Sequence, residues 1–261
     1  MKTPDGHRAK KNSGHRPAIT IETAFVLAAG AGRRLRPITD ATPKPMVKVN
    51  GKPLLDHALD RLAEDGVRKV VVNVHHLADQ IIRHLKNRVN PEIVVSDETD
   101  ALLETGGGVL KGLPLLGGGP FFVVNSDTLW LNGLAPALER LRRRWDPDVM
   151  DGLLLLHSTV DAYGYSGDGD FMADGFGKLV RRPEREVTPY LFTGIQILKP
   201  GVFEGAPEGP FSLNWVYDRL LEKEKLHGLI HDGEWFHVGT AEGLGLAENY
   251  LSQRYAETKH R

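Results

Sequence analysis

The chain has 261 residues, of which 41% are hydrophobic and 26% charged, the balance of a globular protein that buries a substantial core. Its 33 lysine and arginine residues offset 34 acidic ones, so the formal net charge of −1 gives no general attraction to nucleic acid or to an anionic membrane. With 0 cysteines, the sequence also excludes a disulfide scaffold and thiolate metal sites.

The first 22 residues are predicted to form a disordered basic tail. They lack the apolar segment of a secretory signal. Nowhere does the chain approach the roughly 20 apolar residues that a membrane-spanning helix needs. We therefore expect a cytoplasmic protein whose folded domain occupies residues 23–261.

Strands and helices are predicted to alternate between residues 23 and 157. Short apolar runs, typical of buried strands, are separated by stretches whose apolar residues recur at helical spacing. This alternation favours an α/β fold with a mostly parallel sheet. The predicted strands begin near Thr23 and lie at 69–74, 92–95, 121–124 and 152–156, and the predicted helices lie at 54–63, 77–85 and 134–144.

After residue 157 the pattern changes to glycine-rich loops and short runs such as KLVRR and TGIQIL. Together with a turn signal at Asp174 and Gly175, these runs predict a small antiparallel addition in the C-terminal half. Two helices, at 216–224 and 241–252, are expected to close the domain.

A predicted buried strand runs directly into a glycine loop at residues 27–46, LAAGAGRRLRPITDATPKPM. Gly30 and Gly32 allow backbone N–H groups to approach an anion closely, and the loop also carries four cationic side chains. This combination predicts phosphate binding. The cationic residues are Arg33, Arg34, Arg36 and Lys44.

Two better-known glycine motifs do not fit this loop. The dinucleotide fingerprint G-x-G-x-x-G fails because Leu35 stands at its third glycine and Pro37 interrupts the expected helix. The P-loop pattern fails because G-K-[ST] is missing. A plainer alternative is that the glycines only turn the chain and the arginines are solvated.

The pattern L-A-A-G-x-G-x-R-x-x-P-x-T, followed by P-K-P, resembles the signature of the sugar-1-phosphate nucleotidylyltransferase family. The segments NVHHLADQI, ETGGGVLKGLPLL, VVNSD and GEWFHVGT extend the resemblance over nearly everything after the tail. It implies a Rossmann-like three-layer α/β fold with a mostly parallel mixed sheet. It also implies transfer of a nucleotidyl group from a nucleoside triphosphate to a sugar 1-phosphate, with Mg²⁺ as cofactor and release of pyrophosphate.

The resemblance also implies roles for individual residues. Arg34 would hold the β- and γ-phosphates, Lys44 would contact the phosphates in transit, and Asp127 would bind the metal, so these three form the catalytic set. The nucleotide-binding set would be Leu27, Ala28, Ala29, Gly30, Gly32, Arg33, Glu104, Thr105, Gly106 and Gly107. The sugar-phosphate-binding set would be Asn125, Asp170, Arg182 and Gly194.

Asp127 follows the continuous apolar run FFVVNS, which places it at the carboxyl end of a predicted strand, where open α/β sheets bind ligands. A carboxylate oxygen suits Mg²⁺. The alternative is that Asp127 caps a turn or helix after the strand.

The ETGGG segment is expected to wrap the nucleobase, because glycines let main-chain N–H and C=O groups reach the edge of uracil. The alternative is a flexible loop before a helix at 109–113. Asn125, which points the same way as Asp127 on its strand, is expected to reach ribose or sugar hydroxyls.

Two positions depart from the family pattern. His237 stands where W-x-D-V-G-T commonly supplies a second metal-binding carboxylate, so it is either a metal ligand or a packed histidine. Arg182 precedes Pro183 where many relatives carry the lysine of a Glu-Lys-Pro motif, so it either binds the sugar phosphate or belongs to a solvated charge run.

Within the family, the short length and the ETGGG and VNSD segments are most similar to the cell-wall (peptidoglycan) recycling branch, which uses UTP and N-acetylmuramate 1-phosphate. The alternatives are transfer to mannose, glucose or heptose 1-phosphate, and a catalytically silent regulatory subunit that binds a nucleotide sugar. We expect a monomer or homodimer with neither a nucleic-acid nor a membrane partner.

Overall fold

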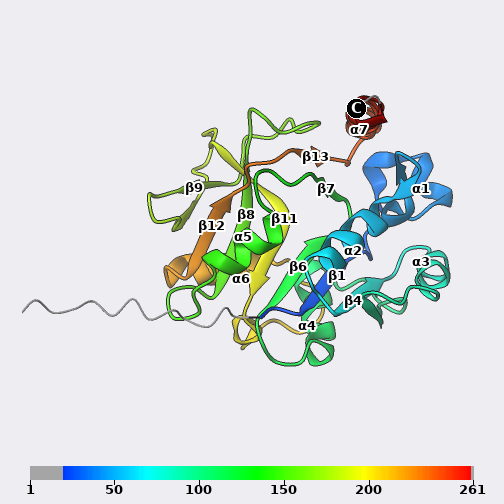
Figure 1. The fold of residues 1–261 in the computed structure, drawn as a ribbon. Helices are drawn as coiled ribbons and strands as arrows, with labels where there is room; N and C mark the ends of the chain where they lie inside the picture. Colours follow the sequence, from blue (N-terminus) through cyan, green and yellow to red (C-terminus); the bar gives the residue numbers. More distant parts are fainter. Residues whose placement is uncertain (1–19, 260–261) are drawn as a thin grey trace, which may run out of the picture.

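The computed structural model describes residues 20–259, and within them nine strands form one mixed sheet (Figure 1). The strand order is β10-β9-β11-β6-β1-β4-β5, and β8 pairs with β11 and with β12. The strands are β1 Thr23–Leu27, β4 Lys69–Val74, β5 Glu92–Asp97, β6 Phe121–Asn125, β8 Gly152–Ser158, β9 Phe171–Ala173, β10 Leu179–Arg181, β11 Tyr190–Leu198 and β12 Leu226–Ile230.

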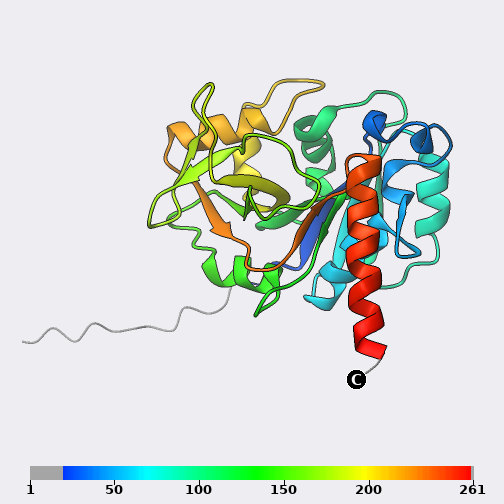
Figure 2. The same cartoon turned by 90° about the horizontal axis from the view of Figure 1, so that it is seen from above.

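Helices cover both faces of this sheet, which makes three layers (Figure 2). Ala24 and Val26 of β1 point into the core beneath α2 Leu54–Glu64, α3 Ala78–Leu85 and α5 Ala137–Arg144. Phe25, between them, points into the opposite core beneath α4 Glu104–Gly112 and α6 Asn214–Glu222. Because successive side chains of a strand alternate between faces, a strand covered on both sides is continuously apolar, as these strands are.

The C-terminal helix α7, Ala241–Lys259, packs on a third apolar cluster rather than on the main sheet. That cluster includes residues of two small antiparallel pairs, β7 Thr128–Trp130 with β13 Trp235–His237, and β2 Lys48–Val49 with β3 Lys52–Pro53. The remaining elements are α1 Ile38–Ala41 and the short 3-10 helices η1 Arg33–Leu35, η2 Lys44–Met46, η3 Leu113–Leu115 and η4 Pro200–Phe203.

The order of the strands reverses at β1. The chain runs from β1 to β4 and β5 on one side and then returns to β6 on the other side of β1, with β1, β4, β5 and β6 parallel. The segments that follow β1 and β6 therefore leave the same edge of the sheet side by side. Such a switch point is where open α/β sheets bind ligands.

The predicted fold class is confirmed, with a parallel section and antiparallel additions through β9, β10 and β11. Helix α5 begins at Ala137, after Pro136, and not at Leu134 as predicted. The ETGGG segment forms the start of α4, whereas the sequence predicted a helix only from Val109.

The predicted tail lies outside the described residues except for its last three. Of these, Ile21 is buried in the core. Among the residues that the structure describes, no helix is long and apolar enough to cross a membrane.

Candidate active site

A cavity of about 350 Å³ opens at the carboxyl edge of the sheet, where β1 and β6 end. It lies at the switch point of the strand order, and its walls come from segments far apart in the sequence. The sequence-predicted residues that line it are Leu27, Ala29, Gly30, Lys44, Glu104, Thr105, Asn125 and Asp127. The structure thus brings together eight predicted residues from four segments of the chain.

The two glycines of the loop after β1 serve different purposes. Gly32 has a φ of +61°, and a Cβ there would lie 2.9 Å from the Cβ of Lys44, so the backbone itself demands glycine. Its carbonyl accepts a hydrogen bond of 2.9 Å from the hydroxyl of Thr39. A Cβ on Gly30 would meet nothing within 4 Å among the described residues, so the space beside Gly30 opens onto the cavity.

Arg33 and Arg34 are exposed on the 3-10 turn that follows this loop. Neither is among the residues that line the cavity. Arg34 is close enough to His237 for its positive charge to have a small lowering effect on the histidine pKa, after the larger effects of burial, Asp127 and Lys44.

Lys44 and Asp127 form an ion pair at the floor of the cavity. The Lys44 side chain is 12% exposed and the Asp127 side chain 32% exposed, so the carboxylate is the more accessible partner. The two residues lie 83 positions apart in the chain, Lys44 at the start of η2 and Asp127 just after β6. A cation and a hard oxygen ligand therefore stand next to each other where a phosphate could enter.

His237 lies beside this pair. It belongs to β13, which pairs with β7 so that His237 is opposite Thr128, the residue after Asp127. Burial is the largest effect on the imidazole and lowers the pKa of His237, whereas the Asp127 carboxylate opposes this shift. The ring is therefore neutral at pH 7, the form that accepts a hydrogen bond or binds a metal.

Within residues 20–259, no group of three or more His, Cys, Asp or Glu side chains gathers in a way that could hold a metal ion. Mg²⁺ needs no such group, since it is commonly held by one or two carboxylates together with waters and substrate phosphates. A single accessible carboxylate in a cavity with a predicted phosphate loop fits that requirement.

The ETGGG segment does not offer its glycine N–H groups to the cavity. Those of Gly106 and Gly107 donate to the carbonyl of Phe211 at 2.8 and 3.1 Å. A Cβ on Gly106 would lie 2.4 Å from the Phe211 ring, so the glycine allows close packing between α4 and the segment before α6. In this structure the N–H groups of Gly106 and Gly107 are therefore engaged within the protein, and Glu104 and Thr105 are the residues of this segment that line the cavity.

Two of the predicted sugar-side residues lie next to each other. Gly194 has a φ of +84°, and a Cβ there would lie 2.8 Å from the side-chain nitrogen of Asn125. The position falls where the pairing of β11 with β8 shifts register, between Phe192 and Gln196. This irregularity brings the backbone of β11 against Asn125 at the edge of the cavity.

Asp170 and Arg182 are engaged elsewhere. The Asp170 carboxylate accepts a hydrogen bond of 2.8 Å from the backbone N–H of Phe192. The Arg182 guanidinium donates to the Glu186 carbonyl at 2.9 Å and lies 3.8 Å from the Asp168 carboxylate. Neither residue lines the cavity, and both stabilise the loops around β9 and β10.

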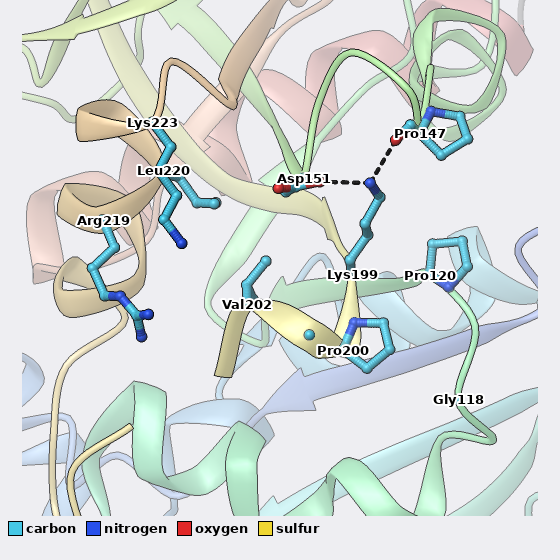
Figure 3. A pocket seen from close by; sticks show the side chains of 11 residues that line it. Gly118, Pro120, Pro147, Asp151, Lys199, Pro200, Val202, Arg219, Leu220 and Lys223 are labelled. Carbon is cyan, nitrogen blue, oxygen red and sulfur yellow. Dashed lines mark hydrogen bonds and ion pairs between the residues drawn. The ribbon is translucent and has the colours of Figure 1, made fainter. Parts of the chain in front are cut away.

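A second cavity, of about 450 Å³, lies at the other end of β6 and contains no predicted site residue (Figure 3). One of its two lysines, Lys199, donates at 2.5 Å to both the Asp151 carboxylate and the Pro147 carbonyl (Figure 3). The candidate cavity is therefore distinguished from this one by the predicted residues that line it and not by its size.

Asn73 lines the candidate cavity between β1 and β6 and was not predicted from the sequence. Its side-chain oxygen accepts a hydrogen bond of 2.7 Å from the backbone N–H of Ala28, in the loop after β1. The sequence did contain a sign of this residue, because Asn73 is an amide inside the apolar run KVVVNV. A polar side chain buried in a strand needs a hydrogen-bond partner.

Comparison with known proteins agrees with this geometry. A family model described as "Nucleotidyl transferase" matches residues 23–254. The chain is 41% identical over 234 residues to the N-acetylmuramate alpha-1-phosphate uridylyltransferase of Caulobacter vibrioides, a match that covers 88% of this chain and 97% of that protein. It is 35% identical over 227 residues to the protein of the same name from Neisseria meningitidis serogroup B, covering 83% and 93%.

The solved structure of HddC from Yersinia pseudotuberculosis, complexed with GMP-PN, matches with a TM-score of 0.72 at 23% identity, over 88% of this chain and 100% of that chain. At that identity the likeness concerns the fold. The family model and the two relatives extend over most of the chain, and they show that it belongs to the nucleotidyl transferase family of enzymes.

Proposed function

We propose that this enzyme transfers a uridylyl group from UTP to N-acetylmuramate 1-phosphate. The observation that carries the proposal is the cavity at the β1–β6 switch point, where the glycine loop, Lys44 and Asp127 meet. The choice of substrates is supported by the 41% identity to a relative named for that reaction. We also propose that the reaction serves peptidoglycan recycling in the cytoplasm.

The chemistry requires little beyond positioning and charge. An oxygen of the sugar 1-phosphate attacks the α-phosphorus of UTP and forms a new P–O bond, while the bond from the α-phosphorus to the bridging oxygen breaks and its electrons leave with pyrophosphate. The attacking oxygen is already ionised, so no general base is needed. The obstacle is repulsion between two anions, which fixed positive charges and in-line positioning relieve.

Two cationic side chains are suited to this task. Lys44, held beside Asp127, would exchange part of its ion pair for phosphate oxygens as the nucleotide enters. Arg34, exposed on the turn after the glycine loop, would hold the β- and γ-phosphates without first breaking a contact within the cavity wall. Gly30 leaves room for the phosphates to approach the backbone.

Asp127 would hold Mg²⁺, and His237 would complete its protein ligands either directly or through water. When bound there, Mg²⁺ supplies further positive charge to the phosphates. Glu104 and Thr105 would face the base, and Asn125 would reach a hydroxyl of the ribose or the sugar.

The proposal is tested by measuring pyrophosphate release with Mg²⁺ from each pairing of UTP, GTP, CTP, ATP and dTTP with N-acetylmuramate, N-acetylglucosamine, glucose and mannose 1-phosphates. We expect release with UTP and N-acetylmuramate 1-phosphate. Release with another pair would keep the reaction and replace the substrates. Silence across the whole grid, also with Mn²⁺, would favour the regulatory alternative.

A further inference from the structure

Glu98 is a carboxylate that the mechanism above leaves unused. It follows β5 and is 0% exposed, although a carboxylate is among the costliest groups to bury. Such burial is tolerated only when hydrogen-bond donors meet the carboxylate, so its partners indicate what it stabilises.

Those partners connect two parts of the nucleotide site. The Asn73 side-chain N–H donates to Oε1 of Glu98 at 2.8 Å, and the backbone N–H of Leu103 donates more weakly to Oε2 at 3.3 Å. Asn73 in turn accepts the backbone N–H of Ala28 at 2.7 Å. A continuous series of hydrogen bonds thus runs from the glycine loop after β1 to the residue before Glu104 at the start of α4.

Gly108 shows how closely this series is packed. A Cβ on Gly108 would lie 2.7 Å from Oε1 of Glu98 and 2.8 Å from the side-chain nitrogen of Asn73. The third glycine of ETGGG is therefore explained by the buried pair, as the first is explained by Phe211.

We propose that Glu98 and Asn73 are positioning residues that fix the spacing between the loop that holds the phosphates and the segment that faces the base. The proposal rests on the binding of a nucleoside triphosphate in this cavity. It adds a residue, Glu98, that affects nucleotide affinity without lining the cavity itself. A shift of either wall would strain the contacts of a nucleotide that spans both.

The direction of each hydrogen bond makes the proposal testable. Glu98 offers acceptors only, and it meets the amide of Asn73 and the N–H of Leu103. In Glu98→Gln, the new NH₂ group must face one of these donors. If the Asn73 amide turned to accept from this NH₂ group, its own NH₂ group would face the N–H of Ala28, and two donors would again oppose each other.

A reciprocal exchange removes the conflict. Asn73→Asp alone sets a carboxylate against the Glu98 carboxylate. In the double variant Asn73→Asp with Glu98→Gln, the new aspartate accepts from Ala28 and from the new amide, whose oxygen accepts from Leu103. Every hydrogen bond is then restored, and only the bond between the two side chains has its donor and acceptor exchanged.

The experiment measures the dissociation constant for the triphosphate by calorimetry and the KM for the sugar 1-phosphate, at a temperature where circular dichroism shows each variant folded. We expect each single variant to bind UTP about tenfold more weakly and the double variant to recover most of that loss, because unmatched buried donors or acceptors are costly. The KM for the sugar 1-phosphate should change little.

Asp65→Asn is the matched control. It makes the same carboxylate-to-amide change in a mostly buried ion pair, with Arg142, away from the cavity. It should lower the melting temperature without changing UTP binding.

Single variants that melt earlier but bind UTP normally would overturn the proposal, as would a double variant that stays as weak as the single ones. If another triphosphate proves to be the substrate, the same variants are compared with that nucleotide. An error in the proposed substrates is thereby distinguished from a failure of the positioning proposal. If no triphosphate binds, both proposals fail.

Discussion

The predicted nucleotide side and the predicted sugar side of the candidate site differ in how their charged groups are engaged. On the nucleotide side, Lys44 and Asp127 pair with each other and both line the cavity. Of the residues predicted for the sugar side, Asp170 accepts from the backbone of β11, Arg182 donates to the backbone of its own loop, and both lie outside the lining of the cavity. A charge that faces a cavity can bind a ligand directly, whereas a charge bonded to the backbone elsewhere must first give up those bonds. We therefore expect substitutions on the two sides to differ strongly in effect.

The largest effect is expected from Asp127→Ala. Loss of the proposed metal ligand should lower kcat for pyrophosphate release about a thousandfold, since the positive charge that offsets repulsion between phosphates is lost. Asp168→Ala, which removes an exposed carboxylate on the sugar side, is the control and should stay near wild type. Full activity in Asp127→Ala would end the metal assignment.

Lys44→Met should lower kcat/KM about a hundredfold, because an electrostatic contact to the reacting phosphates is removed while the volume is nearly kept. The control is Lys48→Met, which makes the same substitution at an exposed lysine on β2. Pyrophosphate release under limiting UTP is the measurement. Equal behaviour of the two variants would show that Lys44 only neutralises Asp127.

Gly106→Ala should weaken UTP binding about tenfold, because overpacking against Phe211 displaces the wall that carries Glu104 and Thr105. Calorimetric titration with UTP is the test. Gly119→Ala is the control, since its Cβ would meet nothing within 4 Å among the described residues. Unchanged binding in Gly106→Ala would mean that this wall does not contact the nucleotide.

The smallest effect is expected from Arg182→Ala. Because the guanidinium must leave Glu186 and Asp168 before it can bind phosphate, the KM for the sugar 1-phosphate should rise only about threefold, as for other exposed charge pairs. Arg185→Ala is the exposed control on the same loop. A hundredfold rise in this KM would contradict the expected difference between the two sides. It would indicate that Arg182 binds the sugar phosphate, as the lysine of the Glu-Lys-Pro motif is expected to do in relatives.

The main strands could be predicted because each is a continuous apolar run, and the structure confirms those that end at Leu27, Val74 and Asn125. The pairing of β7 with β13 could not be predicted in the same way. Each strand has three residues, and the two are separated by about a hundred positions, too short and too distant for a periodic pattern to reveal. That pairing is what brings His237 beside Asp127.

The sequence by itself determined the family signature, the alternation of strands and helices, and a set of residues at strand ends that share one edge of a parallel sheet. These are local patterns, and the geometry of parallel strands converts them into a common site. Only the tertiary structure decided that the Phe211 carbonyl accepts the N–H groups of Gly106 and Gly107, and that Glu98 and Asn73 connect the loop after β1 with the start of α4. These depend on hydrogen bonds between distant segments, whose partners no local pattern specifies.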